Sequence, residues 1–218
     1  MQTSDDLDFE RSSRYESLTG TVEAGFPEYD SPPADPLDLA RRWLESAADH
    51  GVREPRSIAL ATADGRGRVS NRIVTAIELS ARGLLFTTHT SSRKARDLSE
   101  NAWASGNLYW RETSQQLIVS GPVRRLDDAE CDALWDARPV ALHAMTSASR
   151  QSEPVRDVAR LRAEARRLAG PLPRPERFAG YLLDPAEVEF WNSRPDRLHQ
   201  RLRYERDGAA WQWSRLQP

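Results

Sequence analysis

The chain has 218 residues and a formal net charge of -2, with 39% hydrophobic and 29% charged residues. This balance is that of an ordinary folded protein; it argues against a nucleic-acid partner, which usually needs a basic excess, and no apolar stretch is long enough to span a membrane. The chain has one cysteine, too few for an intramolecular disulfide, which predicts a protein of the reducing cytoplasm.

The first 34 residues are polar and end in the proline-rich stretch YDSPPADP. They predict a mobile arm over 1–34, followed by a single domain over 35–218. Asp35 is a suitable N-cap and Pro36 a suitable first position for a helix that ends at Gly51. The apolar residues of this helix recur at helical spacing: Leu37, Ala40, Trp43, Leu44 and Ala47.

A block of β-prone segments follows the first helix. Residues 57–63 and 69–79 flank the turn DGRG and predict a hairpin, and residues 83–89 predict a third strand. Residues 104–110 and 115–126 predict a second hairpin around RETS. Both faces of 69–79 carry apolar side chains, which predicts a central, buried strand.

Two helices and a closing set of strands complete the predicted elements. Asp127 begins a helix that ends before Pro139, and residues 154–169 predict a longer helix. The expected core stripe of the longer helix is Val155, Val158, Leu161, Ala165 and Leu168. The closing strand-like segments are FAGYLLD, EVEFWNS, RLHQRLRYER and AWQWSRL. Antiparallel strands with few helices indicate an α+β fold built on a β-barrel.

The segment TTHTSSRKARDL (87–98) places hydroxyls and cations where a helix begins. Ser91 or Ser92 would cap the helix, whose free N–H groups and positive dipole end attract anions. Arg93 and Lys94 add two full positive charges. The segment therefore predicts an anion site, with an N-capped surface helix and solvated cations as the alternative.

The segment RLHQRLRYER (197–206) is the second candidate for anion binding. In a strand, Arg197, His199, Arg201 and Arg203 would share one face, because side chains alternate between faces. Like charges on one face repel unless water or an anion lies between them. A solvated outer face and an anionic ligand both remain open from this pattern.

Other kinds of site find no support in the sequence. The four histidines show no metal-ligand spacing, which predicts no metal site. No nucleophile elbow of the G-x-S-x-G type and no dinucleotide-binding fingerprint are present.

In their order, the segments resemble the pyridoxamine 5′-phosphate oxidase family. The segments that carry the resemblance are RIVTAI, FTTHTSSRKA, QQLIVSGPVRRL, ARP, SRQSE, EFW and RLHQR, and it extends from about residue 36 to Pro218. It implies a split β-barrel with peripheral helices and a homodimer that binds FMN at the subunit interface. The anion at the start of the 93–98 helix is then expected to be the FMN phosphate.

The resemblance also implies roles for individual residues. Phosphate contacts are expected from Arg72, Ser92, Arg93 and Lys94. The full set of expected FMN contacts is Arg72, Ile73, Val74, Thr75, Thr87, Thr88, Ser92, Arg93, Lys94, Gln116, Gln151, Ser152, Trp191 and Arg201. The expected substrate contacts are Ile77, Leu134, Arg138, Leu142, Arg197 and His199. No catalytic base is assigned.

Three substrate positions depart from the family's pyridoxal-phosphate enzymes. Ile77 stands where those enzymes have a lysine, Leu134 replaces a tyrosine and Leu142 replaces a serine, whereas Arg138 is retained. Each charge-assisted hydrogen bond contributes about 1.5–3 kcal/mol, so losing two lowers affinity for a phosphorylated vitamer by about two to four decades.

One branch of the family fits these departures, the flavin oxidases of phenazine biosynthesis. The segments ESLTGTVEAGFPEY, WASGNLYWRETSQQ and RLHQRLRYERD are similar to that branch. This similarity implies a reduced phenazine carboxylic acid as substrate and O2 as the final acceptor, with peroxide as product. Arginine binds carboxylates in bidentate fashion, which suits Arg138 and Arg197. The alternatives are a pyridoxine/pyridoxamine 5′-phosphate oxidase and a flavin-binding protein without activity.

Overall fold

The computed structural model describes residues 20, 22 and 24–218. The helices are α1 (Pro36–Asp49), α2 (Arg93–Glu100), α3 (Asp128–Asp136), α4 (His143–Ala148) and α5 (Val158–Arg167), with short 3-10 turns at Pro27–Tyr29 and Val140–Leu142. The strands are β1 (Ser57–Ala63), β2 (Val69–Thr75), β3 (Glu78–Ser80), β4 (Gly83–His89), β5 (Trp103–Trp110), β6 (Gln115–Arg125), β7 (Phe178–Leu183), β8 (Glu187–Asn192), β9 (Gln200–Asp207) and β10 (Ala210–Leu216). The predicted α+β class is confirmed.

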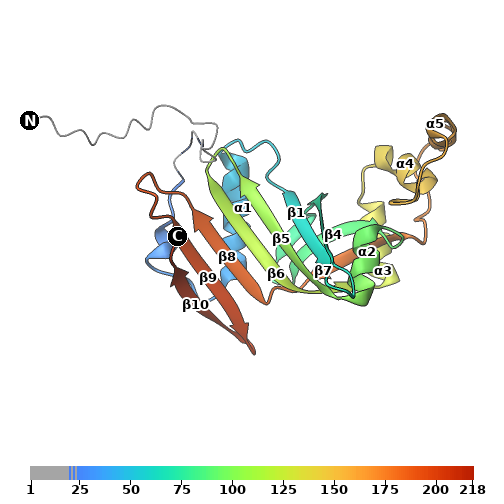
Figure 1. Cartoon of the computed structure of the whole chain (residues 1–218). Helices are drawn as coiled ribbons and strands as arrows, with labels where there is room; N and C mark the ends of the chain where they lie inside the picture. Colours follow the sequence, from blue (N-terminus) through green and yellow to red (C-terminus); the bar gives the residue numbers. More distant parts are fainter. Residues whose placement is uncertain (1–19, 21, 23) are drawn as a thin grey trace, which may run out of the picture.

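The strands form a curled antiparallel sheet in which β6 pairs with three strands, β5, β7 and β8. The main path runs β10-β9-β8-β6-β5-β1-β2, while β7 pairs with β6 and β4, and β4 pairs with β3. The first half of β6 pairs with β8 and its far end pairs with β7, so the sheet divides there. This half-barrel arrangement is that of the predicted split barrel. α2 to α5 lie at one end of it, away from β8 to β10 (Figure 1).

The N-terminal helix packs where its apolar spacing predicts. Asp35 caps α1 through a hydrogen bond from the Leu37 N–H, and Pro36 takes the first helical position. Trp43 of α1 lies edge-on to Phe190 of β8, with ring centroids 5.1 Å apart. α1 therefore seals one face of the sheet with its predicted apolar stripe.

The segment ahead of α1 contributes to the same core. Phe26 is buried, and its ring lies 4.7 Å from that of Trp43. Tyr204 of β9 donates a hydrogen bond to the Pro33 carbonyl. Residues 26–34 thus pack on the domain, although they were expected to belong to a mobile arm; most of the rest of that predicted arm lies outside the described residues.

The prediction of one central buried strand over 69–79 is wrong. The chain forms β2 and β3 there, separated at Ala76, whose N–H donates to the Arg56 carbonyl, and at Ile77, whose N–H donates to Leu85 of β4. In the described chain β2 pairs with β1 alone and is an edge. Two of its apolar side chains are exposed, 65% for Ile73 and 68% for Val69, so they are available to a ligand or a second subunit.

The helix predicted over 154–169 is shorter than expected. Asp157 caps α5 by accepting a hydrogen bond from the Arg160 N–H, so the helix begins after Pro154 and Val155. Of the expected core stripe only Ala165 is buried, while Val155 and Val158 are more than 45% exposed. α4, next to it in the chain, was not predicted. None of the helices in the described part of the chain has the length and apolar character of a membrane span.

The alternation predicted for 197–206 does not extend to its first residues, because β9 begins at Gln200. Arg197 has φ 64° and donates its N–H to the Arg194 carbonyl, so a turn precedes the strand. Arg201 and Arg203 are on β9 as expected. The prediction that four cations share one face of a strand is therefore wrong, because only Arg201 and Arg203 lie in the strand.

Candidate functional site

A cavity of about 720 Å³ opens between the edge of the sheet and helices α2 and α3. Its lining comes from β2, β4, the start of α2, the α3 end and the loop after α4. The predicted site residues that line it are Arg72, Ile73, Val74, Thr75, Ile77, Thr87, Thr88, Arg93, Lys94, Leu134, Arg138, Leu142, Gln151 and Ser152. Its size suits a cofactor or small ligand.

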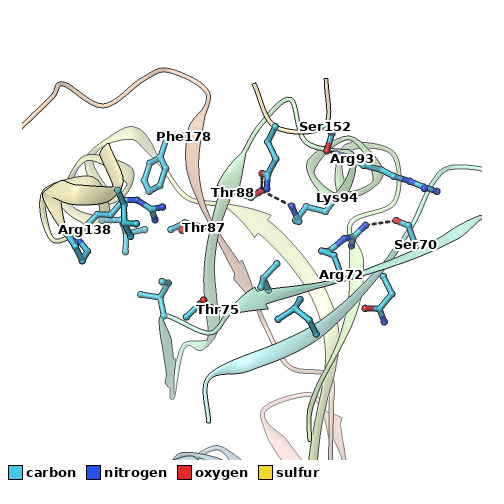
Figure 2. A pocket seen from close by; sticks show the side chains of 18 of the residues that line it. Ser70, Arg72, Thr75, Thr87, Thr88, Arg93, Lys94, Arg138, Ser152 and Phe178 are labelled. Atoms are coloured by element: carbon cyan, nitrogen blue, oxygen red, sulfur yellow. Dashed lines mark hydrogen bonds between the residues drawn. The ribbon is translucent and has the colours of Figure 1, made fainter. Parts of the chain in front are cut away.

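One end of the cavity gathers three cations. Figure 2 shows Arg72, Arg93 and Lys94 on one side, with Arg138 and Phe178 on the other. Among the described residues, neither Arg93 nor Lys94 forms an ion pair with a carboxylate. The Asp97 carboxylate, 3.6 Å from Arg72, offsets only part of the three positive charges. The remaining charges repel one another, and an anionic ligand would reduce that repulsion.

The start of α2 is built as the sequence predicts. Ser92 is the N-cap, and its hydroxyl accepts a hydrogen bond from the Ala95 N–H at 3.3 Å. Ser92 is fully buried and does not line the cavity, so its predicted phosphate contact stays a prediction. Lys94 is 5% exposed, which excludes the alternative of a solvated cation for this residue.

Lys94 is a titratable group near neutral pH. Burial and, next, the positive charge of Arg72 lower its pKa from 10.5 to about 8. Its ammonium donates to the Thr88 hydroxyl at 3.0 Å (Figure 2). A bound dianion would stabilise the charged form of Lys94, so binding and protonation support each other.

Arg72 reaches the cavity from the sheet edge. Its guanidinium donates to the Leu60 carbonyl at 3.1 Å and to the Thr62 hydroxyl at 2.8 Å, both on β1, and also to Ser70. Burial lowers the pKa of Arg72, with the carboxylate of Asp97 acting in the opposite direction. The arginine is therefore held in place before any ligand arrives.

The loop after α4 is tied across the strand β4 and the start of α2. Gln151 accepts a hydrogen bond from the Thr88 hydroxyl at 2.8 Å, and Ser152 accepts one from the Arg93 N–H at 3.1 Å. His89 Nδ1 accepts from the Gln151 N–H at 3.2 Å. Burial, then the charges of Arg177, Lys94 and Arg138, lower the His89 pKa from 6.5 to about 4, so the ring is neutral and keeps this lone pair at neutral pH.

The opposite end of the cavity is lined by apolar side chains and one arginine. Ile77, Leu134 and Leu142 line it, as does Arg138. The Arg138 guanidinium lies 5.5 Å from the centre of the Phe178 ring, and its Nε is buried without a hydrogen-bond partner. Burial lowers the pKa of Arg138. This end suits a flat apolar group that carries an anionic substituent.

Five predicted site residues lie elsewhere in the chain. Gln116, Trp191 and Arg201 are register partners across β6, β8 and β9, and Trp191 lies 4.8 Å from the ring of His199. None of these four residues lines the large cavity, and Arg197 does not line it either. β2 and β8 are four strand positions apart in the sheet, or about 19 Å at the usual strand spacing.

The two arginines of β9, Arg201 and Arg203, are paired with carboxylates. Arg201 Nε donates to Glu189 at 2.8 Å, and Arg203 lies 2.9 Å from Glu187 and 2.8 Å from Glu205. The repulsion expected along this strand is therefore relieved by glutamates rather than by an anion. His199 Nδ1 accepts from the Arg194 N–H, which fixes its ring beside Trp191.

Several lining residues were not predicted from the sequence. Ser70, Asn71, Ala137, Pro139 and Phe178 also line the cavity. Ser70 could have been found, because it is two residues from Arg72 on the same strand and so shares its face. The described residues contain no group of three or more His, Cys, Asp or Glu side chains suited to a metal ion.

The fold and this cavity together define a split-barrel protein with a pocket lined by cations at a helix start. Residues 44–170 match the family model described as pyridoxamine 5′-phosphate oxidase, and residues 178–218 match the pyridoxine 5′-phosphate oxidase C-terminal dimerisation region. The chain belongs to the pyridoxamine 5′-phosphate oxidase family.

Individual relatives have more specific names. A dihydrophenazinedicarboxylate synthase of Pseudomonas chlororaphis is 54% identical over 206 residues, which is 93% of each chain. A pyridoxine/pyridoxamine 5′-phosphate oxidase of Alcanivorax borkumensis is 37% identical, over 84% of this chain and 90% of its own. The crystal structure of PhzG from Burkholderia lata with tetrahydrophenazine-1-carboxylic acid is 51% identical, with a TM-score of 0.87, and covers 91% of this chain and 100% of that one.

Proposed function

We propose that the protein is an FMN-dependent oxidase that acts late in phenazine biosynthesis on reduced phenazine carboxylic acids. The observation that carries this proposal is the division of one cavity into a cationic end and an apolar end with a lone arginine. The names of the two phenazine relatives support it, as they act on or bind molecules of this class.

The cationic end is suited to the FMN phosphate. Arg72 and Lys94 are held in place by hydrogen bonds, and Arg93 lies at the start of α2, where the helix dipole favours an anion. Gln151 and Ser152 are fixed against this region by their own hydrogen bonds. When bound, FMN supplies the redox chemistry, in which the substrate loses a hydride and a proton and O2 is reduced to peroxide.

The apolar end is suited to the substrate. Leu134, Leu142 and Ile77 can cover a flat ring system and exclude water, while Arg138 pairs with a carboxylate. A vitamer phosphate there would be desolvated beside one arginine only, which is costly. The residues orient the substrate and neutralise its charge, and no side chain is assigned as a base.

The second group of predicted residues would complete the site from the partner subunit. Gln116, Trp191 and Arg201 are too far along the sheet to share the cavity of their own chain. We therefore propose a homodimer with an FMN at each of two equivalent sites at the subunit interface, which agrees with the match to a dimerisation region. Cys131 is a buried free thiol, and we propose the cytoplasm as the place of action.

The test is a steady-state assay of the purified protein reconstituted with FMN. We expect stoichiometric FMN, and O2 consumption with peroxide formation when a reduced phenazine carboxylate is added. A protein that binds FMN and leaves every reduced phenazine unoxidised would be a flavin-binding protein without this activity. Oxidation of pyridoxine or pyridoxamine 5′-phosphate in its place would support the vitamer oxidase.

A further inference from the structure

Asp97 is a buried carboxylate on α2 that does not itself line the cavity. It is 5% exposed and lies one helical turn after Arg93. Its Oδ2 accepts hydrogen bonds from the Thr62 and Ser70 hydroxyls, both at 2.7 Å, and lies 3.6 Å from Arg72 Nη2. A buried carboxylate with three such partners is rarely incidental, because burying it without them is costly.

The same two hydroxyls also hold Arg72. The guanidinium donates to Thr62 at 2.8 Å and, through its other terminal nitrogen, to Ser70. A hydroxyl has one proton, so a hydroxyl that donates to Asp97 turns its lone pairs toward the arginine. The carboxylate thereby fixes the direction of both hydroxyls, and the hydroxyls fix the guanidinium.

This network lies behind the cationic end of the cavity. Arg72 and Ser70 line the cavity, whereas Thr62 and Asp97 do not. Burial opposes ionisation of Asp97, but the hydrogen bonds from Thr62 and Ser70 and the charge of Arg72 outweigh it, and its pKa lies below the ordinary value. Arg72 comes from an edge strand, so its side chain needs such support to point one way.

We propose that Asp97 is a positioning residue that orients Arg72 toward the phosphate of the bound cofactor. This inference rests on the proposed binding of FMN and adds a residue that touches neither cofactor nor substrate. Charge alone predicts the opposite effect, since a carboxylate near the site repels a phosphate. The sign of the change in affinity therefore separates positioning from simple electrostatics.

The first experiment titrates FMN and riboflavin into apo-protein carrying Asp97→Asn. Riboflavin lacks the phosphate, so it reports on the rest of the site. We expect the Kd for FMN to rise about tenfold, as one charge-assisted contact is weakened, with the Kd for riboflavin unchanged. The matched control is Glu100→Gln on the same helix, whose carboxylate accepts from the Gly65 N–H and is not among the hydrogen-bond and ion-pair partners of Arg72 in the described chain; it should change neither Kd.

A double-mutant cycle tests whether Asp97 acts through Arg72. In an Arg72→Gln background, Asp97→Asn should have no further effect on the FMN Kd. The proposal would be overturned if the losses of FMN affinity in Asp97→Asn and Arg72→Gln were additive. It would also be overturned if Asp97→Asn left the FMN Kd unchanged or lowered it, or raised the riboflavin Kd as much as the FMN Kd.

A second variant guards against a folding defect. Thr62→Val keeps the side-chain shape and the carboxylate but removes one of the two hydroxyls, and it should reproduce the loss that is specific to FMN. Normal FMN affinity in a folded Thr62→Val protein would refute the network. If the unmodified protein itself fails to bind FMN, the proposed function fails, and the inference fails with it.

Discussion

Lys94 shows at the scale of one residue how burial prepares a site for an anion. It is 5% exposed, its one hydrogen-bond acceptor in the described chain is Thr88, and its pKa is lowered to about 8 by burial and by Arg72. A phosphate restores the charged form, so affinity gained from Lys94 is complete below pH 8 and is lost as the pH rises through 8.

The first prediction concerns this pH dependence. Between pH 8 and pH 10 the FMN Kd of the apo-protein should rise by up to about tenfold per pH unit. Lys94→Met should raise the Kd about 10- to 100-fold at pH 7, because one charge-assisted contact is lost, and should flatten the alkaline branch. Fluorescence titration at each pH measures both, and a variant with the same alkaline slope as the unmodified protein would rule out Lys94.

The second prediction concerns His89. Its folded pKa of about 4 lies below the ordinary 6.5, so its contribution to stability is present above pH 6.5 and is lost as the pH falls toward 4. The protonated ring would also lose the lone pair that accepts from the Gln151 N–H. Urea unfolding at several pH values should show that the free energy of unfolding falls between pH 6.5 and pH 4. The fall should be smaller in His89→Gln than in the unmodified protein.

The control for this measurement is the exposed His50, at the end of α1. In the described chain the side chain of His50 bonds only within α1, so His50→Gln keeps the hydrogen bond between His89 and Gln151 and provides the comparison for His89→Gln. If His89→Gln and the unmodified protein lose the same free energy between pH 6.5 and pH 4, the tie between His89 and the loop is unimportant.

Single residues divide into those that the sequence could reveal and those that it could not. Arg93 and Lys94 were predictable, because cations beside a helix cap have a known chemistry. Asp97 was not, because a carboxylate within a helix usually faces solvent, and its burial depends on Thr62, 35 positions away. Glu189 on β8 was also missed, because its pairing with Arg201 depends on β8 and β9 lying side by side.

At the scale of elements, the edge strand β2 forms one wall of the cavity. Its hydrophobic pattern predicted a central strand, but β2 pairs with β1 alone and leaves Val69 and Ile73 exposed. Periodicity reports that both faces of a strand are apolar and cannot tell whether protein or a ligand covers them. The apolar spacing over 154–169 likewise predicted a buried stripe, whereas Val155 and Val158 are exposed in the single chain.

The third prediction separates neighbouring arginines near the start of β9. Arg201→Ala should weaken FMN binding, whereas Arg197→Ala, in the turn before the strand, should keep FMN and lower kcat/KM for the substrate. Arg203→Ala is the matched control, because Arg203 lies on the same strand and is paired with glutamates as Arg201 is, but is not a predicted FMN or substrate contact; it should change neither. Flavin content and steady-state kinetics distinguish the three, and the reverse ranking of Arg197 and Arg201 would refute their assignment.

At the scale of the whole molecule, the predicted site residues form two groups that do not meet within one chain. The cavity lies between β2 and α2, and the row of Gln116, Trp191 and Arg201 crosses β6, β8 and β9. The order of the segments predicted the fold, which is confirmed, and named the residues of both groups, whose roles stay predictions. Their separation could not be predicted, because it depends on how the sheet curls.

The fourth prediction uses this separation in mixed dimers. Arg93→Ala with Lys94→Ala removes the cationic part, and Arg201→Ala removes the other part, so each homodimer should bind FMN poorly. After unfolding and refolding together, half of the dimers are mixed and half of their sites are native, so about a quarter of the unmodified activity should return. No recovery, with mixed dimers present by mass analysis, would mean that each site is built from one chain.

The central claim is that the cavity selects a reduced phenazine carboxylate over a vitamer phosphate. Its most direct test mixes the FMN-loaded protein anaerobically with each reductant and follows flavin absorbance in a stopped-flow instrument. We expect rapid bleaching by reduced phenazine mono- or dicarboxylates and little by pyridoxamine 5′-phosphate, since Ile77, Leu134 and Leu142 offer a phosphate no partner beside Arg138. Rapid bleaching by pyridoxamine 5′-phosphate with none by reduced phenazines would contradict the account.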